Sequence, residues 1–147
     1  MSKMKMIGEY TIQGTVAQST TERIMLFDGR WDTGFRIKSI TIGPQTPYGN
    51  NDCFLVAKTE DDGLLGEGWR WDDNRQIGWA SWIADGVGTA NTDQGIVNPD
   101  NMIIEDLYLS AGANQAGNGT NYLIRMEKYE FEDYEGAYAM VRNRSQA

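Results

Sequence analysis

The side chains in this sequence that could carry chemistry are carboxylates and tryptophans. The chain of 147 residues has 21 acidic residues against 13 Lys and Arg, no histidine and a single cysteine. Without histidine there is no Ser-His-Asp or Cys-His catalytic system and no histidine-ligated zinc. One cysteine excludes an intramolecular disulfide. A hydrolase that works through two facing carboxylates is a distant alternative, because a single sequence does not show such a pairing across a cleft.

Three groups of neighbouring acids could offer the oxygen ligands that calcium prefers. They are Glu60-Asp61-Asp62, Asp72-Asp73 and the pair Asp28 and Asp32. None matches the twelve-residue calcium loop with its glycine and terminal glutamate, and Asp before Gly is ordinary turn chemistry. We therefore expect solvated turn acids, no metal site and no cofactor.

Four of the five tryptophans gather in one short stretch, at positions 69, 71, 79 and 82. Trp69 and Trp71 alternate, so an extended chain would place both on one face, and Tyr48 lies in a loop of Pro, Gly and Asn. Exposed aromatic rings bind sugar rings and protein partners alike. We predict that Trp79 and Trp82 belong to the core, and that Trp69, Trp71 and Tyr48 form a contact surface or sugar platform.

Short β-branched and aromatic runs, separated by Gly, Asn and Asp, predict the elements that position these side chains. The expected strands cover residues 7–16, 22–27, 34–42, 52–58, 75–83, 102–109 and 120–129. A change of apolar phase predicts a β-bulge near Ser39. The apolar run after Asp52 predicts a central strand that buries Cys53. The glycine-rich stretches 84–101 and 110–119 are expected to be surface loops.

The C-terminal stretch has a different pattern, because its apolar residues from Phe131 onward have helical spacing. Residues 131–144 are therefore expected to form an amphipathic segment with a short helix. The chain length suits one domain. Together these patterns predict an all-β protein, with residues 1–147 forming a single antiparallel β-sandwich of jelly-roll type that ends in a short helix.

The charge is unevenly distributed along the chain. Four bases lie within a few residues of the ends, whereas residues 6–141 hold 9 basic and all 21 acidic residues, a net charge of −12. Terminal bases are often simply solvated, but basic ends could also contact the acidic body of a neighbouring subunit. We expect a homo-oligomer whose candidate interface residues are Lys3, Lys5, Tyr134, Tyr138, Arg142 and Arg144.

The acidic composition also bears on partners and location. A pI near 4.5 argues against nucleic-acid binding, because an acidic surface repels phosphates. No apolar run approaches the ~18 residues of a membrane span, and the N-terminal stretch lacks the pattern of a signal peptide. We expect synthesis in a cytoplasm and no membrane contact.

Several stretches resemble small virion proteins of tailed bacteriophages: residues 27–37 (FDGRWDTGFRI), residues 71–80 (WDDNRQIGWA) and residues 122–129 together with 136–145. The resemblance implies a non-enzymatic structural protein of the virion, either a capsid decoration or cement protein or a component of an appendage. Its partners would be further copies of itself, the major capsid protein or other virion proteins. The alternative is a carbohydrate-binding β-sandwich module for host-surface attachment, with Trp69 and Trp71 as its platform.

Overall fold

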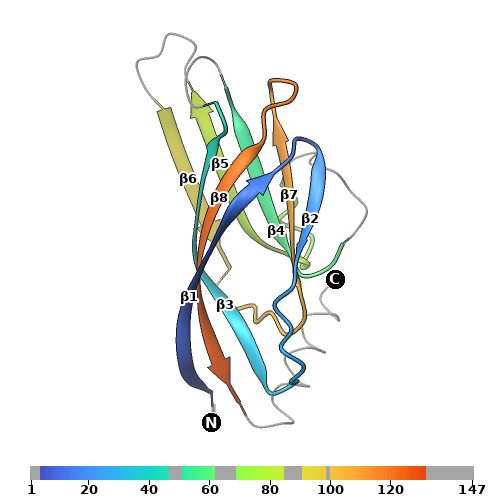
Figure 1. The fold of residues 1–147 in the computed structure, drawn as a ribbon, viewed down its shortest axis with the longest axis vertical. Helices are drawn as coiled ribbons and strands as arrows, with labels where there is room; N and C mark the ends of the chain where they lie inside the picture. The colour runs from blue at the N-terminus through green and yellow to red at the C-terminus, as the bar shows by residue number, and fades with distance from the viewer. Residues whose placement is uncertain (1–3, 47–50, 62–68, 85–90, 99, 132–147) are drawn as a thin grey trace.

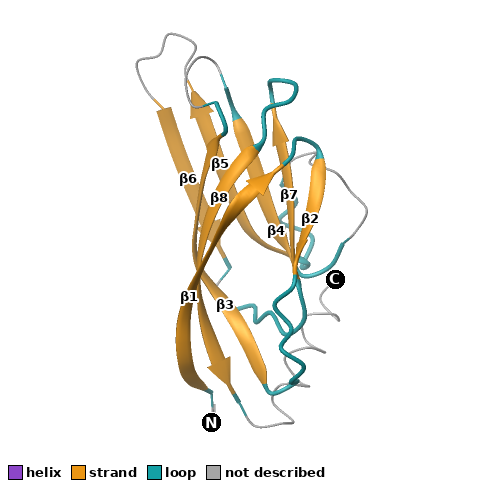
Figure 2. Ribbon diagram, in the orientation of Figure 1, coloured by secondary structure: helices purple, strands orange, loops and turns teal. Residues whose placement is uncertain are grey.

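The computed structural model describes residues 4–46, 51–61, 69–84, 91–98 and 100–131, and this part of the chain is all-β (Figure 2). Its strands form two antiparallel sheets. The three-stranded sheet has the order β1-β8-β3, and the five-stranded sheet has the order β2-β7-β4-β5-β6 (Figure 1). The strands are β1 (Lys5–Val16), β2 (Thr20–Ile24), β3 (Thr33–Pro44), β4 (Cys53–Lys58), β5 (Gln76–Ala84), β6 (Asn91–Val97), β7 (Leu107–Ala113) and β8 (Thr120–Glu130).

Most strands lie where the alternation of apolar residues predicts them. β4 is central, between β7 and β5, and Cys53 is buried as expected. The predicted bulge is confirmed, because the register of β3 against β8 shifts between Ile37 and Ser39. The expected helix within residues 131–144 lies outside the described residues, apart from the buried Phe131.

The strand expected at 22–27 covers Thr20–Ile24 instead, so residues 25–27 lie in the following loop. Residues 110–113 of the expected surface loop 110–119 belong to β7, where Ser110 and Ala111 are buried. Two further segments differ from the prediction. The expected loop 84–101 contains β6, which pairs with β5 at the edge of the five-stranded sheet. The strand expected at 102–109 begins only at Leu107, and before it Ile103 makes an isolated bridge to Phe35. In both cases backbone hydrogen bonds to another strand decide the structure, and the local apolar pattern does not reveal them.

One core of buried side chains joins the two sheets. Alternate residues of β3 and β8 face the same core as residues of β4, β5 and β7. Its members with the least exposed side chains include Val16, Leu55, Ile77, Leu107, Leu109, Ile124 and Met126.

β6 lies directly against the backbone of β3. A Cβ atom at Gly95 would clash with the carbonyl oxygen of Ile40, and one at Gly78 on the neighbouring strand would clash with the Ile40 side chain. Only glycine permits this approach at Gly95, because the obstacle is backbone and not a flexible side chain. The two sheets therefore meet closely along β3.

The three-stranded sheet projects beyond the five-stranded sheet at one end. In Figure 1 the first half of β1, the first half of β3 and the second half of β8 extend below the strands of the other sheet. The segment between β2 and β3 reaches this end, where Phe131 donates its backbone N–H to the carbonyl oxygen of Asp32. This projecting end exposes both faces of β1 to other molecules.

Candidate functional site

The structure brings the two predicted tryptophans together. The rings of Trp69 and Trp71 stack with their centroids 6.2 Å apart and an angle of 19° between their planes. Trp71 is 64% exposed, whereas Trp69 is half-buried beneath it. The structure thus places these two rings side by side, while Tyr48 lies outside the described residues.

Trp79 and Gln76 support the stacked pair from below. Trp79 is buried and meets Trp71 edge to face at 6.0 Å. Its indole Nε1 donates to Gln76 Oε1 at 2.9 Å, and the backbone N–H of Arg70 donates to the same oxygen at 2.8 Å. Because Gly78 faces Ile40 in the core, its neighbour Trp79 lies on the opposite, outward face of the five-stranded sheet.

The prediction that Trp79 and Trp82 are core residues therefore needs refinement. Trp79 is buried, but under the aromatic stack and not between the sheets. Trp82 is half-buried and packs against the edge of the main core. The buried amide of Gln76, which fixes the stack, carried no signal in the sequence, because glutamine in a strand is usually exposed.

Among the candidate interface residues, the structure describes Lys5. It is exposed at the start of β1 and lies opposite Glu130 of β8. The other five lie outside the described residues: Lys3, Tyr134, Tyr138, Arg142 and Arg144.

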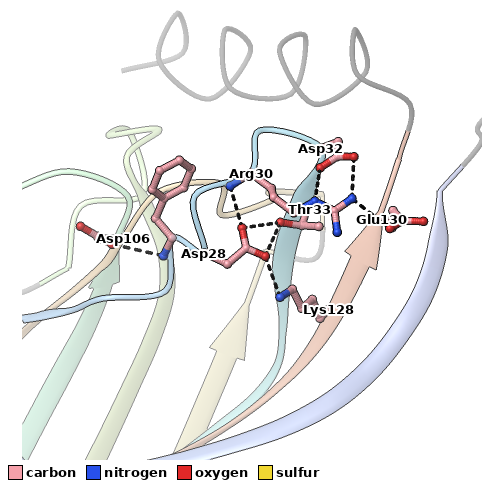
Figure 3. A network of polar contacts seen from close by, with 8 residues as sticks. Asp28, Arg30, Asp32, Thr33, Asp106, Lys128 and Glu130 are labelled. Atoms are coloured by element: carbon pink, nitrogen blue, oxygen red, sulfur yellow. Dashed lines mark hydrogen bonds and ion pairs between the residues drawn. The ribbon is translucent and has the colours of Figure 1, made fainter.

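The acids of the β2–β3 turn are paired with cations and are not simply solvated (Figure 3). Asp28 accepts hydrogen bonds from the backbone N–H of Arg30 at 2.9 Å, from Thr33 Oγ1 at 2.9 Å and from Lys128 Nζ at 2.8 Å. Gly29, with φ of 87°, makes the turn that the Asp-Gly pair predicts.

The second acid of the turn has its own partner. Two guanidinium nitrogens of Arg30 donate to the two carboxylate oxygens of Asp32, at 2.9 and 2.7 Å, and one of them also donates to Glu130 at 3.1 Å. These contacts tie the turn to the end of β8, about a hundred residues later in the chain. The cluster, called here the clasp, therefore holds the β2–β3 turn against the end of β8, and each of its carboxylates already has a cationic partner.

Hydrogen bonds lower the pKa of the Asp28 carboxyl strongly. Burial alone would raise the pKa of this carboxyl, but the hydrogen bonds from Lys128, Arg30 and Thr33 outweigh it and hold the pKa at about 2. A carboxyl whose pKa is depressed in the folded state stabilises the fold above its ordinary pKa of 3.8, and this stabilisation is lost as the pH falls from 3.8 through 2.

We therefore expect Asp28→Asn to lower the free energy of unfolding at pH 7 by about 1–2 kcal/mol, because the ion pair with Lys128 is lost. The variant should also lose less stability than the native chain when the pH falls from 5 to 2. Urea denaturation at a series of pH values measures both effects. Asp72→Asn is the matched control, since the Asp72 side chain is 79% exposed. An unchanged pH profile in Asp28→Asn would contradict the clasp.

A second exposed feature is the apolar surface at the start of β1, formed by Met4, Met6, Ile7 and Tyr10 and called here the β1 surface. Each of these side chains is between 38% and 49% exposed. Of all the residues in β1 only Val16 is buried. Within the described ranges β1 pairs with β8 alone, so its other edge carries unpaired backbone groups.

A third feature is the loop between β2 and β3, which exposes Met25, Phe27 and Trp31. Met25 is 78% exposed, and the rings of Phe27 and Trp31 lie 4.8 Å apart. The buried carboxylate of Asp106 accepts hydrogen bonds from the backbone N–H groups of Leu26 and Phe27. Sequence reasoning did not single out this surface, although its apolar residues beside an Asp-Gly turn were a visible signal.

A fourth feature is a shallow groove of about 480 Å³ on the outward face of the three-stranded sheet. Gly43, which lies between the inward-facing Ile42 and Pro44, is one of its lining residues. The space above Gly43, called here the hollow, is open, because a Cβ atom there would meet no atom within 4 Å. The side chains that line the groove carry no charge.

Neither a metal centre nor a membrane-crossing helix is found in the described residues. No three side chains of the metal-binding types His, Cys, Asp and Glu gather closely enough there to hold a metal ion. Asp62, part of one acidic run, lies outside these residues. No helix in the same part of the chain has the length and apolar character needed to cross a bilayer. The recognisable surfaces are thus the aromatic stack, two apolar surfaces and the groove.

Comparisons with protein-family models, with curated proteins and with solved structures found no match to this chain.

Proposed function

We propose that this chain is a non-enzymatic structural protein of a tailed-phage virion, which decorates or cements the capsid or builds an appendage through protein–protein contacts. The observation that carries the proposal is the β1 surface, where three large apolar side chains lie exposed on an edge strand and Met4 lies exposed just before it. The resemblance of residues 27–37 and 71–80 to phage virion proteins agrees with it.

The physical case rests on how proteins normally protect an edge strand. Proline, short length and repeated charges prevent such edges from pairing with other chains. β1 has twelve residues, no proline and only two charged residues, Lys5 and Glu9. Exposed apolar side chains on an otherwise acidic protein mark an interaction site. A second copy, or a strand of another virion protein, would bury this surface.

The strand order supports a jelly-roll β-sandwich, an architecture common in viral capsids and lectins. In an eight-stranded jelly roll one sheet has the order 1-8-3-6 and the other 2-7-4-5. Seven strands of this chain follow that order, and the exception is β6, which pairs with β5 instead of β3. β6 nevertheless packs on β3 through Gly95, so a shift of one edge strand relates the two arrangements.

Assembly on a particle would not require a strong individual interface. When many copies sit on a symmetric lattice, contacts of modest affinity act together and hold the layer. This suits a small domain with separate apolar surfaces on β1 and on the β2–β3 loop.

The test is the double substitution Met6→Gln and Ile7→Thr. We expect it to weaken self-association, or binding to purified virions, at least tenfold, because two apolar side chains are lost from the contact. Sedimentation velocity and virion co-sedimentation measure this. The control Ile83→Thr removes an isoleucine of β5 that is 53% exposed, against 43% for Ile7, and should bind normally. A native chain that stays monomeric at low and high salt and does not bind virions would contradict the proposal.

The second candidate function is carbohydrate binding at the aromatic stack. It is favoured by one observation, the broad exposure of Trp71 on the ring of Trp69. A flat exposed indole is a surface on which the C–H face of a sugar can rest. Glycan-array binding that disappears in the variant Trp69→Ala/Trp71→Ala, with the fold intact, would favour this function over virion assembly.

A further inference from the structure

The groove on the three-stranded sheet is built from two transverse rows of residues. Strand register places Gln13, Leu123 and Thr41 side by side across β1, β8 and β3. The next row, in the same strand order, is Thr15, Asn121 and Gly43. All six lie on the outward face, because their neighbours along each strand face the core.

The second row is fixed in place. Thr15 Oγ1 lies 2.7 Å from Asn121 Oδ1 and donates a hydrogen bond to it, and Asn121 Nδ2 lies 3.5 Å from the carbonyl oxygen of Pro44. The amide is thus held from both sides at the floor of the groove. Beside it, the open space over Gly43 leaves room for a ligand atom where other residues would place a side chain.

The first row offers polar side-chain groups that can hydrogen-bond a ligand. The side chains of Gln13 and Thr41 are exposed and have no hydrogen-bond partner among the described residues. Gln13 supplies an amide and Thr41 a hydroxyl, so each can donate and accept. Between them lies Leu123, whose side chain is partly exposed and offers an apolar surface.

These properties narrow the class of ligand. β8 is paired on both sides, so a peptide cannot bind here by adding a strand, and recognition must come from side chains. No charge lines the groove, although the whole chain has a net charge of −8. The groove volume is within the range of small-ligand sites. The groups present suit a ligand rich in hydroxyls, uncharged, and with an apolar C–H face.

We propose that this groove binds a neutral saccharide, with Gln13 and Thr41 hydrogen-bonding its hydroxyls, Leu123 beneath its C–H face and one substituent in the hollow over Gly43. The site is independent of the virion role, and it lies on the opposite outward face from the stack of Trp69 and Trp71. A saccharide bound here would leave both the β1 surface and the aromatic stack free.

The experiment uses the full chain on an array of neutral, sialylated and sulfated oligosaccharides. The neutral oligosaccharide that binds most strongly is then titrated into the native chain and its variants by NMR of backbone amides. We expect the shifted signals to gather at residues 13–15, 41–43 and 121–123. Gly43→Val should fill the hollow and weaken binding at least tenfold without loss of stability, because the space over Gly43 is open.

Two further variants separate the groove from the aromatic stack. Thr41→Val removes the hydroxyl at nearly constant shape and should weaken binding about fivefold, while Trp71→Ala should leave it within twofold of the native value. Binding that is lost in Trp71→Ala but kept in Gly43→Val would overturn the proposal, as would a lack of binding to every neutral oligosaccharide. Gly43→Val should also assemble normally, so a failure here is distinguishable from a failure of the virion proposal.

Discussion

Replacing Ile124 by alanine is expected to lower the free energy of unfolding by about 3–4 kcal/mol. Ile124 lies in the middle of β8, opposite Ile12 of β1 and Ile40 of β3, and none of its surface is exposed. Truncation removes buried apolar atoms and leaves a cavity between two sheets that cannot close fully around it. Urea and thermal denaturation of the purified chain measure the loss.

Leu123 provides the matched control one residue earlier on the same strand. It faces outward and is 39% exposed, so Leu123→Ala should cost less than about 1 kcal/mol. A ratio of three or more between the two losses is the expected result. Equal losses would contradict the assignment of the two faces of β8, and with it the core that joins the sheets.

The second large effect is expected at Asp106, a buried carboxylate at the end of the connection before β7. Oδ2 accepts from Arg23 Nε at 2.7 Å, while Oδ1 accepts from the backbone N–H groups of Leu26 and Phe27 at 3.2 and 3.4 Å. Burial alone would raise the pKa of Asp106, but these hydrogen bonds outweigh it and lower the pKa. Its stabilising contribution is therefore present at neutral pH and lost in acid.

We expect Asp106→Ala to lower the free energy of unfolding by about 2–3 kcal/mol at pH 7, because two backbone donors lose their acceptor. Asp106→Asn keeps an acceptor oxygen at this place and should cost less. The same loss should loosen the exposed loop that carries Met25, Phe27 and Trp31. Urea denaturation and faster amide hydrogen exchange at residues 26–27 report the two effects. A cost below 1 kcal/mol for Asp106→Ala would contradict this role.

Much of the fold is predictable because alternation of apolar residues records which face of a strand is buried. The pattern of Tyr122, Ile124 and Met126 locates β8, and the phase change around Ser39 locates the bulge in β3. The run after Cys53, apolar on both faces, correctly predicts a strand in the middle of a sheet.

The parts that sequence reasoning missed depend on backbone pairing and on polar partners, which the apolar pattern does not record. β6 has the sequence NTDQGIV, and it forms a strand because its backbone pairs with β5 at an edge, where few apolar side chains are needed. In the sequence, Asp106 is a polar residue that interrupts an apolar stretch. Its partners Arg23 and Phe27 lie beside it only in the folded chain. No local pattern encodes such partners, since they lie about eighty residues away.

The candidate sites also differ in whether the sequence alone predicts them. Trp69 and Trp71 are close in the sequence, so their shared surface was predictable. The groove is not, because its rows combine β1, β3 and β8 and become visible only once the register is known. Gly43 in particular lies just beyond the expected strand 34–42, and its open outward side is evident only in the folded chain.

We propose that this chain works by contact through the exposed edge of β1, and electron cryomicroscopy of the native virion is the most direct test. We expect the chain to occupy ordered, repeated positions on the particle, with Met6 and Ile7 buried against a neighbouring protein. Density that contains no copy of the chain, or copies in which the β1 edge always faces solvent, would contradict it.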